Sequence, residues 1–200
     1  RAVFKVWYSC CMKLIGIVGP SGSGKTTLVK QLASLSEDVQ HIRLDNYFKD
    51  PETFPRKEGF LNWERPENLK FDELIAHLKL LKEGKEVHTK TFPKKKGSES
   101  KPITLKPKPI VIIEGFMLFK NEEIREILDM KIYLDIPKEL MLERRGIRFG
   151  EEHVNNYDTK VAIPEFLDYG IIQKEYADYV VGASKSQEEV VKEVSGIIRI

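Results

Sequence analysis

The sequence has little cysteine, no long apolar run and almost no excess of charge of one sign. Its 2 cysteines are adjacent, Cys10 and Cys11, which excludes a disulfide framework or a zinc site and fits the reducing cytoplasm. No apolar run approaches the ~20 residues of a membrane-spanning helix. A net charge of +2 gives no reason to expect nucleic acid as a partner. We therefore expect a cytoplasmic protein with neither a membrane segment nor a nucleic-acid partner.

The residues that are present suit one globular domain. Hydrophobic residues make up 41% of the chain and charged residues 32%, a balance typical of folded proteins. A chain of 200 residues can bury a substantial core and still include a small lid or insertion. Because Met12 stands just before the first apolar run, we expect residues 1–11 to be a leader or upstream extension and residues 12–200 to form one domain.

Apolar runs alternate with helical repeats along the chain. Short runs rich in β-branched residues predict strands over residues 13–18, 39–44, 110–113, 131–135 and 179–181. Leucine and valine spacing predicts helices over residues 25–36, 66–84, 121–128, 137–148 and 185–198. Strands that alternate with helices predict an α/β fold, with a central parallel sheet and helices on both faces.

Three segments interrupt this alternation. Residues 50–65 are rich in proline, glycine and charge, which is typical of a loop. Around Lys94–Lys96 the chain is rich in lysine, proline, glycine and serine, so we expect an exposed hairpin or loop over about 85–108 with these lysines solvated. A mixed polar stretch follows the predicted helix that ends at Arg148, and residues of about 145–162 are the expected lid.

The segment GPSGSGKTT, Gly19–Thr27, lies between the first predicted strand and the first predicted helix. It matches G-x-x-x-x-G-K-[ST] in the structural context that this phosphate-binding motif requires. Glycines let backbone N–H groups face a phosphate, and the helix N-terminus adds further donors. We predict nucleoside triphosphate binding here, with Lys25 on the phosphate oxygens and the Thr26 hydroxyl on Mg²⁺. The residues assigned to the triphosphate are Gly19, Ser21, Gly22, Ser23, Gly24, Lys25, Thr26 and Thr27.

The loop alone does not distinguish a kinase from a GTPase, a motor ATPase or a synthetase. A switch GTPase needs a guanine-reading Asn-Lys-x-Asp segment, which the sequence lacks. Motor and transporter ATPases usually end a strand in an Asp or Asp-Glu pair, whereas IVIIEG carries one glutamate and then glycine.

Two carboxylates end predicted strands, Asp45 after the second and Glu114 after the third. Open parallel sheets bind ligands at the carboxyl ends of their strands. There Asp45 could take a proton from an acceptor hydroxyl or join a metal site, and Glu114 could hold a Mg²⁺-bound water. Taken singly, Asp45 also fits a helix cap or turn and Glu114 a plain strand end. Their joint appearance favours function.

Three arginines, Arg144, Arg145 and Arg148, lie near the end of one predicted helix. Such a cluster can clamp a transferring phosphoryl group when a lid closes. The alternative is a solvated helix face on which the arginines pair with Glu139, Glu143 and Glu151.

The sequence resembles the uridine kinase and phosphoribulokinase group of P-loop kinases, from Met12 almost to the C-terminus. The resemblance lies in GPSGSGKTT, LDNYF, NWERPENLKFDEL, IVIIEGFMLF, KIYLDIPKELMLERRGIR and YADYVV, in this order. It implies a three-layer P-loop NTPase fold with a small lid and a substrate-side hairpin or loop insertion. It also implies transfer of the γ-phosphate of ATP, with Mg²⁺, to the 5′-hydroxyl of a ribonucleoside.

The resemblance further implies roles for single residues. Asp45 matches the catalytic base, and Lys25 with the lid arginines Arg145 and Arg148 would hold the migrating phosphoryl charge. Glu64 stands where uridine kinases have an aspartate that grips the ribose hydroxyls. The other residues assigned to the nucleoside are Tyr47, Phe48, Trp63 and Arg145, and those assigned to the nucleotide are Arg144, Gly182 and Ala183. Packing of Trp63 against the core is an equal alternative to stacking on a base.

The acceptor is left open by two departures from the uridine kinase pattern. The stretch TFPKKKGSES lacks the Tyr-Asp, His and Arg residues that read a pyrimidine, and the lid stretch FGEEHVNNYD is acidic. The segments KEGFLNWERPENL, EGFMLF and VAIPEFLDYG are similar to those of nicotinamide riboside kinases. The alternatives are therefore a uridine or cytidine kinase, a nicotinamide riboside or other small-metabolite kinase, and, in another class, a catalytically inactive nucleotide-binding regulator. Homo-oligomerisation is also left open.

Overall fold

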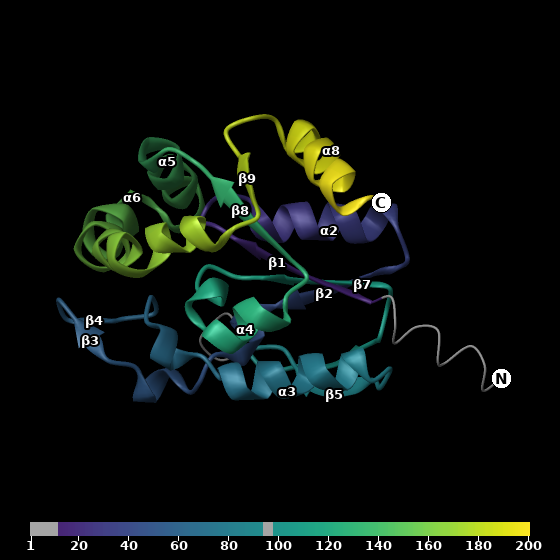
Figure 1. The fold of residues 1–200 in the computed structure, drawn as a ribbon. Coiled ribbons are helices and arrows are strands. Elements are labelled where there is room, and N and C mark those ends of the chain that lie inside the picture. Colours follow the sequence, from purple (N-terminus) through teal and green to yellow (C-terminus); the bar gives the residue numbers. More distant parts are fainter. Residues whose placement is uncertain (1–11, 94–97) are drawn as a thin grey trace, which may run out of the picture.

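Five parallel strands form the central sheet of the computed structural model, which describes residues 12–93 and 98–200 (Figure 1). Each neighbouring pair of strands is parallel. This confirms the predicted α/β fold with a parallel sheet. In order across the sheet the strands are β2 (Val39–Arg43), β7 (Ile110–Glu114), β1 (Lys13–Val18), β8 (Met130–Asp135) and β9 (Tyr179–Gly182).

Helices cover both faces of the sheet. Helices α2 (Lys25–Leu35) and α8 (Gln187–Ile198) lie over one face, and α3 (Phe71–Lys82) and α4 (Glu122–Ile127) lie over the other (Figure 1). Side chains of β1 alternate between the two layers, because successive strand residues point to opposite faces. Ile15 and Ile17 pack with Leu28 of α2, whereas Leu14 and Val18 belong to the core cluster that includes the buried residues of α3 and α4.

The predicted helix over residues 66–84 is wrong in its first turn. Pro66–Asn68 forms a 3₁₀ turn, and α3 begins only at Phe71. The intervening backbone pairs with another segment: the N–H of Lys49 donates to the Asn68 carbonyl, and the N–H of Lys70 donates to the Tyr47 carbonyl. These bonds require extended backbone after Asn68, so the turn that begins at Pro66 does not run on into α3.

The stretch expected to be mixed and polar is mostly helical. Helix α5 (Lys138–Phe149) ends at Gly150, whose φ of 94° is a backbone conformation that favours glycine. Helix α6 (Glu151–His153), a π-helical segment (Val154–Ala162) and α7 (Ile163–Glu165) follow, and a second π-helical segment (Phe166–Gly170) and a 3₁₀ helix (Ile171–Tyr176) lead to β9. These helices group beside one end of the sheet (Figure 1).

Two hairpins extend from the layers. The first, β3 (Arg56–Lys57) with β4 (Phe60–Leu61), lies in the segment expected to be a loop. The second joins β5 (Val87–Lys90) to β6 (Pro102–Leu105) within the expected insertion. The expected leader 1–11 and Lys94–Lys96 lie outside the described residues.

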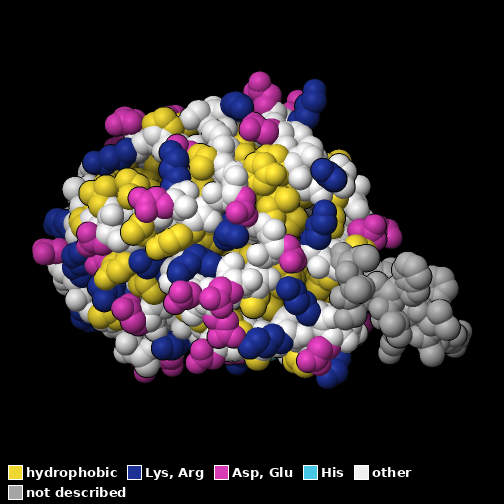
Figure 2. Space-filling model, viewed as in Figure 1, with side chains coloured by type: hydrophobic (Ala, Val, Ile, Leu, Met, Phe, Trp, Pro, Cys, Tyr) yellow, Lys and Arg dark blue, Asp and Glu magenta, His cyan; other side chains and the backbone are white. Residues whose placement is uncertain are grey.

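No helix among residues 12–93 and 98–200 is both long and apolar enough to cross a bilayer. Figure 2 shows acidic and basic side chains intermixed over the visible face.

Candidate active site

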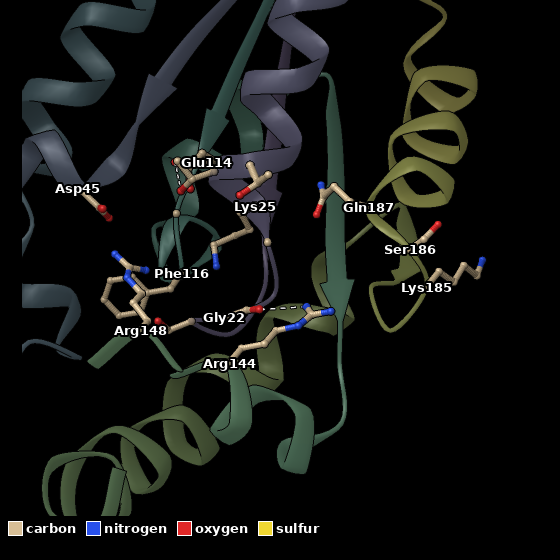
Figure 3. Close-up of a pocket in the computed structure, with 15 residues that line it drawn as sticks. Gly22, Lys25, Asp45, Glu114, Phe116, Arg144, Arg148, Lys185, Ser186 and Gln187 are labelled. Atoms are coloured by element: carbon tan, nitrogen blue, oxygen red, sulfur yellow. Dashed lines mark hydrogen bonds between the residues drawn. The ribbon is translucent and has the colours of Figure 1, made fainter. Parts of the chain in front are cut away.

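A cavity of about 560 Å³ opens at the carboxyl ends of β1, β2 and β7 (Figure 3). The glycine loop forms its floor, Asp45 and Arg148 lie at one side, and the segment before α8 lies at the other (Figure 3). Segments that are far apart in the sequence therefore meet at one site. The predicted residues that line it are Ser21, Gly22, Gly24, Lys25, Thr26, Thr27, Asp45, Glu114, Arg144 and Arg148.

The glycine loop adopts a backbone that only glycine reaches easily. Gly22 and Gly24 have φ values of 92° and 89°, in the left-handed region, and Gly24 caps α2. The Lys25 ammonium donates to the carbonyls of Gly19, at 2.8 Å, and Pro20, at 2.9 Å. Burial lowers the pKa of Lys25 to about 8, although the neighbouring Glu114 carboxylate opposes this shift. The loop thus holds a lysine whose charge the site itself does not fully compensate.

Thr26 and Glu114 meet beside the loop. The Thr26 hydroxyl donates to Oε1 of Glu114 at 2.9 Å. Burial by itself raises the pKa of Glu114, but the His41 hydrogen bond and the Lys25 charge outweigh it, so the pKa is lowered and the side chain is a carboxylate. A hydroxyl and a carboxylate next to a phosphate-binding loop suit Mg²⁺, which usually keeps water and phosphate ligands. Among the described residues no cluster of three His, Cys, Asp or Glu could hold a metal alone.

Asp45 follows β2 at the cavity wall, where it is the second residue of the 3₁₀ turn Leu44–Tyr47. Its carboxylate accepts a hydrogen bond from the Arg43 guanidinium at 2.5 Å. A Cβ on Gly115 would collide with the Leu44 side chain, so glycine after Glu114 lets the ends of β7 and β2 approach. The close approach brings the Asp45 and Glu114 carboxylates to the same cavity.

Arg43 and His41 are site residues that the sequence reasoning missed. Both contact Oε1 of Glu114 at 3.4 Å. The available signal is the period of two along β2, since Arg43 pairs with Glu114 in the parallel register. Residues 41 and 43 of β2 and residue 114 of β7 therefore share one face of the sheet.

The structure does not bring Tyr47, Phe48 or Trp63 into this cavity. Tyr47 is 1% exposed, and its hydroxyl bonds to Nδ1 of His77 at 2.9 Å, under α3. Phe48 and Trp63 pack edge to face with ring centroids 5.4 Å apart, within an aromatic cluster. The 3₁₀ turn after β2 directs Tyr47 back into the core. For Trp63, these contacts agree with packing against the core, the alternative to stacking on a base. Phe116, which was not predicted, lines the cavity instead.

Arg145 lies in a second, small space of about 20 Å³ next to the loop, together with Glu64. Its guanidinium donates to the fully buried Asp158 carboxylate, and this bond connects α5 to the π-helical segment. Burial raises the pKa of Glu64 to about 7, against the lowering effect of the Arg145 charge. Tyr157 bonds to Glu64 at 3.4 Å. Arg145 and Arg148, predicted to act together, thus occupy different spaces.

Arg144 connects the glycine loop to the loop after β9. Its guanidinium donates to the carbonyls of Gly22 and Ala183, each at 3.1 Å. Gly182 and Ala183, assigned to the nucleotide, do not line the cavity. Lys185, Ser186 and Gln187, just beyond them, line it instead.

A parallel sheet, a glycine loop that opens a helix, and strand-end carboxylates define the class of P-loop nucleotide-binding proteins. Two solved structures share the fold. A "possible uridine kinase" from Bacillus stearothermophilus has a TM-score of 0.57 and 22% identity, with 84% of this chain and 88% of that chain aligned. Shikimate kinase from Acinetobacter baumannii has a TM-score of 0.58 and 19% identity, with 98% of this chain and 97% of that chain aligned. At these identities the likeness concerns the fold alone.

Within that class, the chain belongs to the phosphoribulokinase / uridine kinase family, whose model matches residues 14–190. A uridine kinase from Borrelia turicatae is 30% identical to it, with 94% of this chain and 95% of the relative aligned. A uridine kinase from Chlamydia pneumoniae is 31% identical, with 94% and 89% aligned. The family confirms the resemblance noted from the sequence, and it makes the chain a kinase, a phosphotransferase that acts on a hydroxyl group.

Proposed function

We propose that this chain transfers the γ-phosphate of ATP to the 5′-hydroxyl of a ribonucleoside, as a uridine or cytidine kinase does. The observation that carries the proposal is the placement of Asp45 and Glu114 in the same cavity as the phosphate loop. The uridine kinase names of the aligned relatives support the nucleoside as acceptor. Residues 12–200 would act as one domain in the cytoplasm, with about 145–162 as its lid.

The chemistry of the step follows from the positions of the side chains. Asp45 would orient the acceptor hydroxyl and accept its proton as oxygen attacks the γ-phosphorus and the bond to the β-phosphate oxygen breaks. Lys25 and Arg148 face the cavity and would neutralise the charge on the transferred group. Mg²⁺ bound by Thr26 and Glu114 would screen the phosphate oxygens. Alignment of the reactants and charge stabilisation account for most of the acceleration.

The acceptor side is formed around Glu64 and Arg145. We propose that the Glu64 carboxyl and the Arg145 guanidinium bind the two ribose hydroxyls when their space opens. The small volume of about 20 Å³ requires movement of the helices after α5 before a nucleoside can enter. Nicotinamide riboside carries the same ribose, so this subsite alone does not choose between the two acceptors.

An ATP-consumption assay over a panel of acceptors tests the proposal. The panel is uridine, cytidine, nicotinamide riboside, adenosine, ribulose 5-phosphate and pantothenate, and we expect turnover with uridine or cytidine. Turnover with nicotinamide riboside instead would support the alternative that sequence similarity leaves open. ATP binding without consumption for every acceptor would indicate a nucleotide-binding regulator and would contradict the proposal.

The variant Asp45→Asn tests the proposed base. We expect kcat to fall ~10²-fold or more, because the amide cannot accept the proton, while calorimetry shows little change in ATP affinity. The matched control is Asp135→Asn: Asp135 also ends a strand, but it pairs with Lys174 and does not line the main cavity. Asp135→Asn should keep the activity of the wild type. An Asp45→Asn enzyme as fast as the control would remove Asp45 as the base.

A further inference from the structure

One arginine joins the two carboxylates of the site. The Arg43 guanidinium donates from Nη2 to Oδ2 of Asp45 at 2.5 Å and from Nε towards Oε1 of Glu114 at 3.4 Å. The Arg43 side chain is only 18% exposed, so much of the contact is shielded from water. A single rigid, planar cation therefore contacts both the proposed base and the proposed magnesium ligand.

The backbone fixes this bridge. Arg43 is the last residue of β2 and lies opposite Glu114, the last residue of β7, in the parallel register. Asp45 comes two residues later, in the 3₁₀ turn that begins at Leu44. The arginine is therefore anchored by the sheet, whereas Asp45 belongs to a turn and its side chain is 39% exposed. The more rigid partner holds the less rigid one.

The bridge also decides which carboxylate oxygens remain available. Oε1 of Glu114 is contacted by Thr26, His41 and Arg43, and Oδ2 of Asp45 is contacted by Arg43. Within residues 12–93 and 98–200, no hydrogen bond is made to Oε2 of Glu114 or to Oδ1 of Asp45. One oxygen of each carboxylate is thus left for a ligand. Arg43 also offsets the repulsion between two like charges in one cavity.

We propose that Arg43 is a positioning residue for phosphoryl transfer: it ties Asp45 to Glu114 and so directs the free oxygen of Asp45 to the acceptor hydroxyl. The inference rests on the proposed function of Asp45 as the base. Arg43 does not line the cavity and touches no substrate in this scheme. Its contribution is orientation, because a base gives its full effect only when it is held in the productive geometry.

The kinetic test compares Arg43→Met, Arg43→Lys and a remote control, Arg199→Met. Arg199 is exposed and follows α8 at the end away from the cavity. We expect Arg43→Met to lower kcat ~10- to 100-fold and to change the KM for ATP less than ~3-fold, since the phosphate loop is untouched. Arg43→Lys keeps the charge but cannot span both carboxylates, so its kcat should stay at least ~5-fold below that of the wild type. The control should be unaffected.

A double-mutant cycle separates positioning from a general effect on folding. If Arg43 acts through Asp45, adding Arg43→Met to Asp45→Asn should lower kcat less than ~3-fold further. Full multiplication of the two losses would overturn the inference, as would Arg43→Met or Arg43→Lys turning over like the wild type. If Arg43→Met does not fold, Arg43→Lys alone decides.

Crystal structures provide a readout that needs no acceptor. We expect the Asp45 carboxylate to keep its place in the wild type and in Arg199→Met and to leave it in Arg43→Met and Arg43→Lys. An unmoved Asp45 in both Arg43 variants would overturn the inference. If the wild type phosphorylates no nucleoside, the proposed function fails, yet these structures still decide whether Arg43 orients Asp45.

Discussion

At the scale of single residues, the protonation of Lys25 responds to what the phosphate loop binds. Burial lowers the pKa of its ammonium to about 8. The ordinary pKa of lysine is about 10.4, so between the two values the folded protein binds fewer protons than the unfolded chain, and stability from this group rises with pH. A bound triphosphate brings negative charge and must raise the pKa again.

Nucleotide binding should therefore take up protons near pH 8. We expect calorimetric titrations with an ATP analogue, in buffers of different ionisation enthalpy, to show uptake of up to about half a proton per site. The uptake should shrink towards pH 6, where Lys25 is already charged, and should vanish in Lys25→Met. Equal uptake in that variant would mean that another group responds.

Glu64 should make the protein less stable as the pH rises towards neutrality. Burial raises its pKa to about 7, above the ordinary value of about 4.3. Between these values the folded protein binds more protons than the unfolded chain, so the stability from this group is lost as the pH rises. We expect Glu64→Gln to have a higher melting temperature than the wild type at pH 7.5 and a smaller difference at pH 5. A constant difference in melting temperature between the two proteins across this range would contradict the raised pKa of Glu64.

The residues whose place in the cavity could be predicted are those that belong to a local sequence pattern. The loop glycines, Lys25 and Thr26 form one motif, and Asp45 and Glu114 come directly after apolar runs that predict strands. The position of Arg43 in the site was not predicted, because its partners come from β7 and from a turn and only the strand register brings them together. The position of Tyr47 outside the cavity could not be predicted for a similar reason, since the direction of its side chain depends on the 3₁₀ turn and on His77.

At the scale of elements, one buried ion pair ties α5 to the π-helical segment. Arg145 and Asp158 have side chains 6% and 0% exposed. We expect Asp158→Asn to lower the free energy of unfolding by roughly 3 kcal/mol, because breaking a buried pair leaves an uncompensated charge. Hydrogen exchange should also quicken between residues 151 and 170. Urea unfolding measures the first effect and mass spectrometry the second.

The control for this variant is Lys174→Gln, which breaks the exposed pair between Lys174 and Asp135. Those side chains are 44% and 42% exposed. Because water screens such pairs, the loss should stay below about 1 kcal/mol. If the two variants lose the same stability, the Arg145–Asp158 pair does not fasten the helices after α5.

Most elements of the sheet layers could be predicted, and most failures involve irregular geometry. The limits of β1 match the prediction, because a β-branched run between a polar start and a glycine loop leaves little choice. The turn at Pro66 could not be predicted, because the backbone after it pairs with a distant segment. The hairpin β3–β4 could not be predicted either, because its turn depends on positive φ values at Glu58 and Gly59. The π-helical segment has no sequence signal in a polar stretch.

At the scale of the whole molecule, the sheet order explains how one short motif gains partners from across the chain. β1 lies between β7 and β8, so the glycine loop emerges between the ends of strands that carry Glu114 and lead into α5. The alternation of strands and helices predicted a parallel sheet, but not the order of its strands. That order places the cavity among segments near residues 20, 45, 114, 145 and 186.

Nucleotide binding should consequently protect three segments that are distant in the sequence. In the proposed function, an ATP analogue with Mg²⁺ would contact the loop. Arg144 already donates to the carbonyls of Gly22 and Ala183, so the segments that it connects should become more ordered as well. We expect slower hydrogen exchange at Gly19–Thr27, residues 144–148 and residues 185–187. The hairpin β5–β6 pairs separately from the main sheet and serves as the internal control, with unchanged exchange. Arg144→Met should confine protection to the loop; protection of all three segments in that variant would mean that the nucleotide itself, rather than Arg144, connects them.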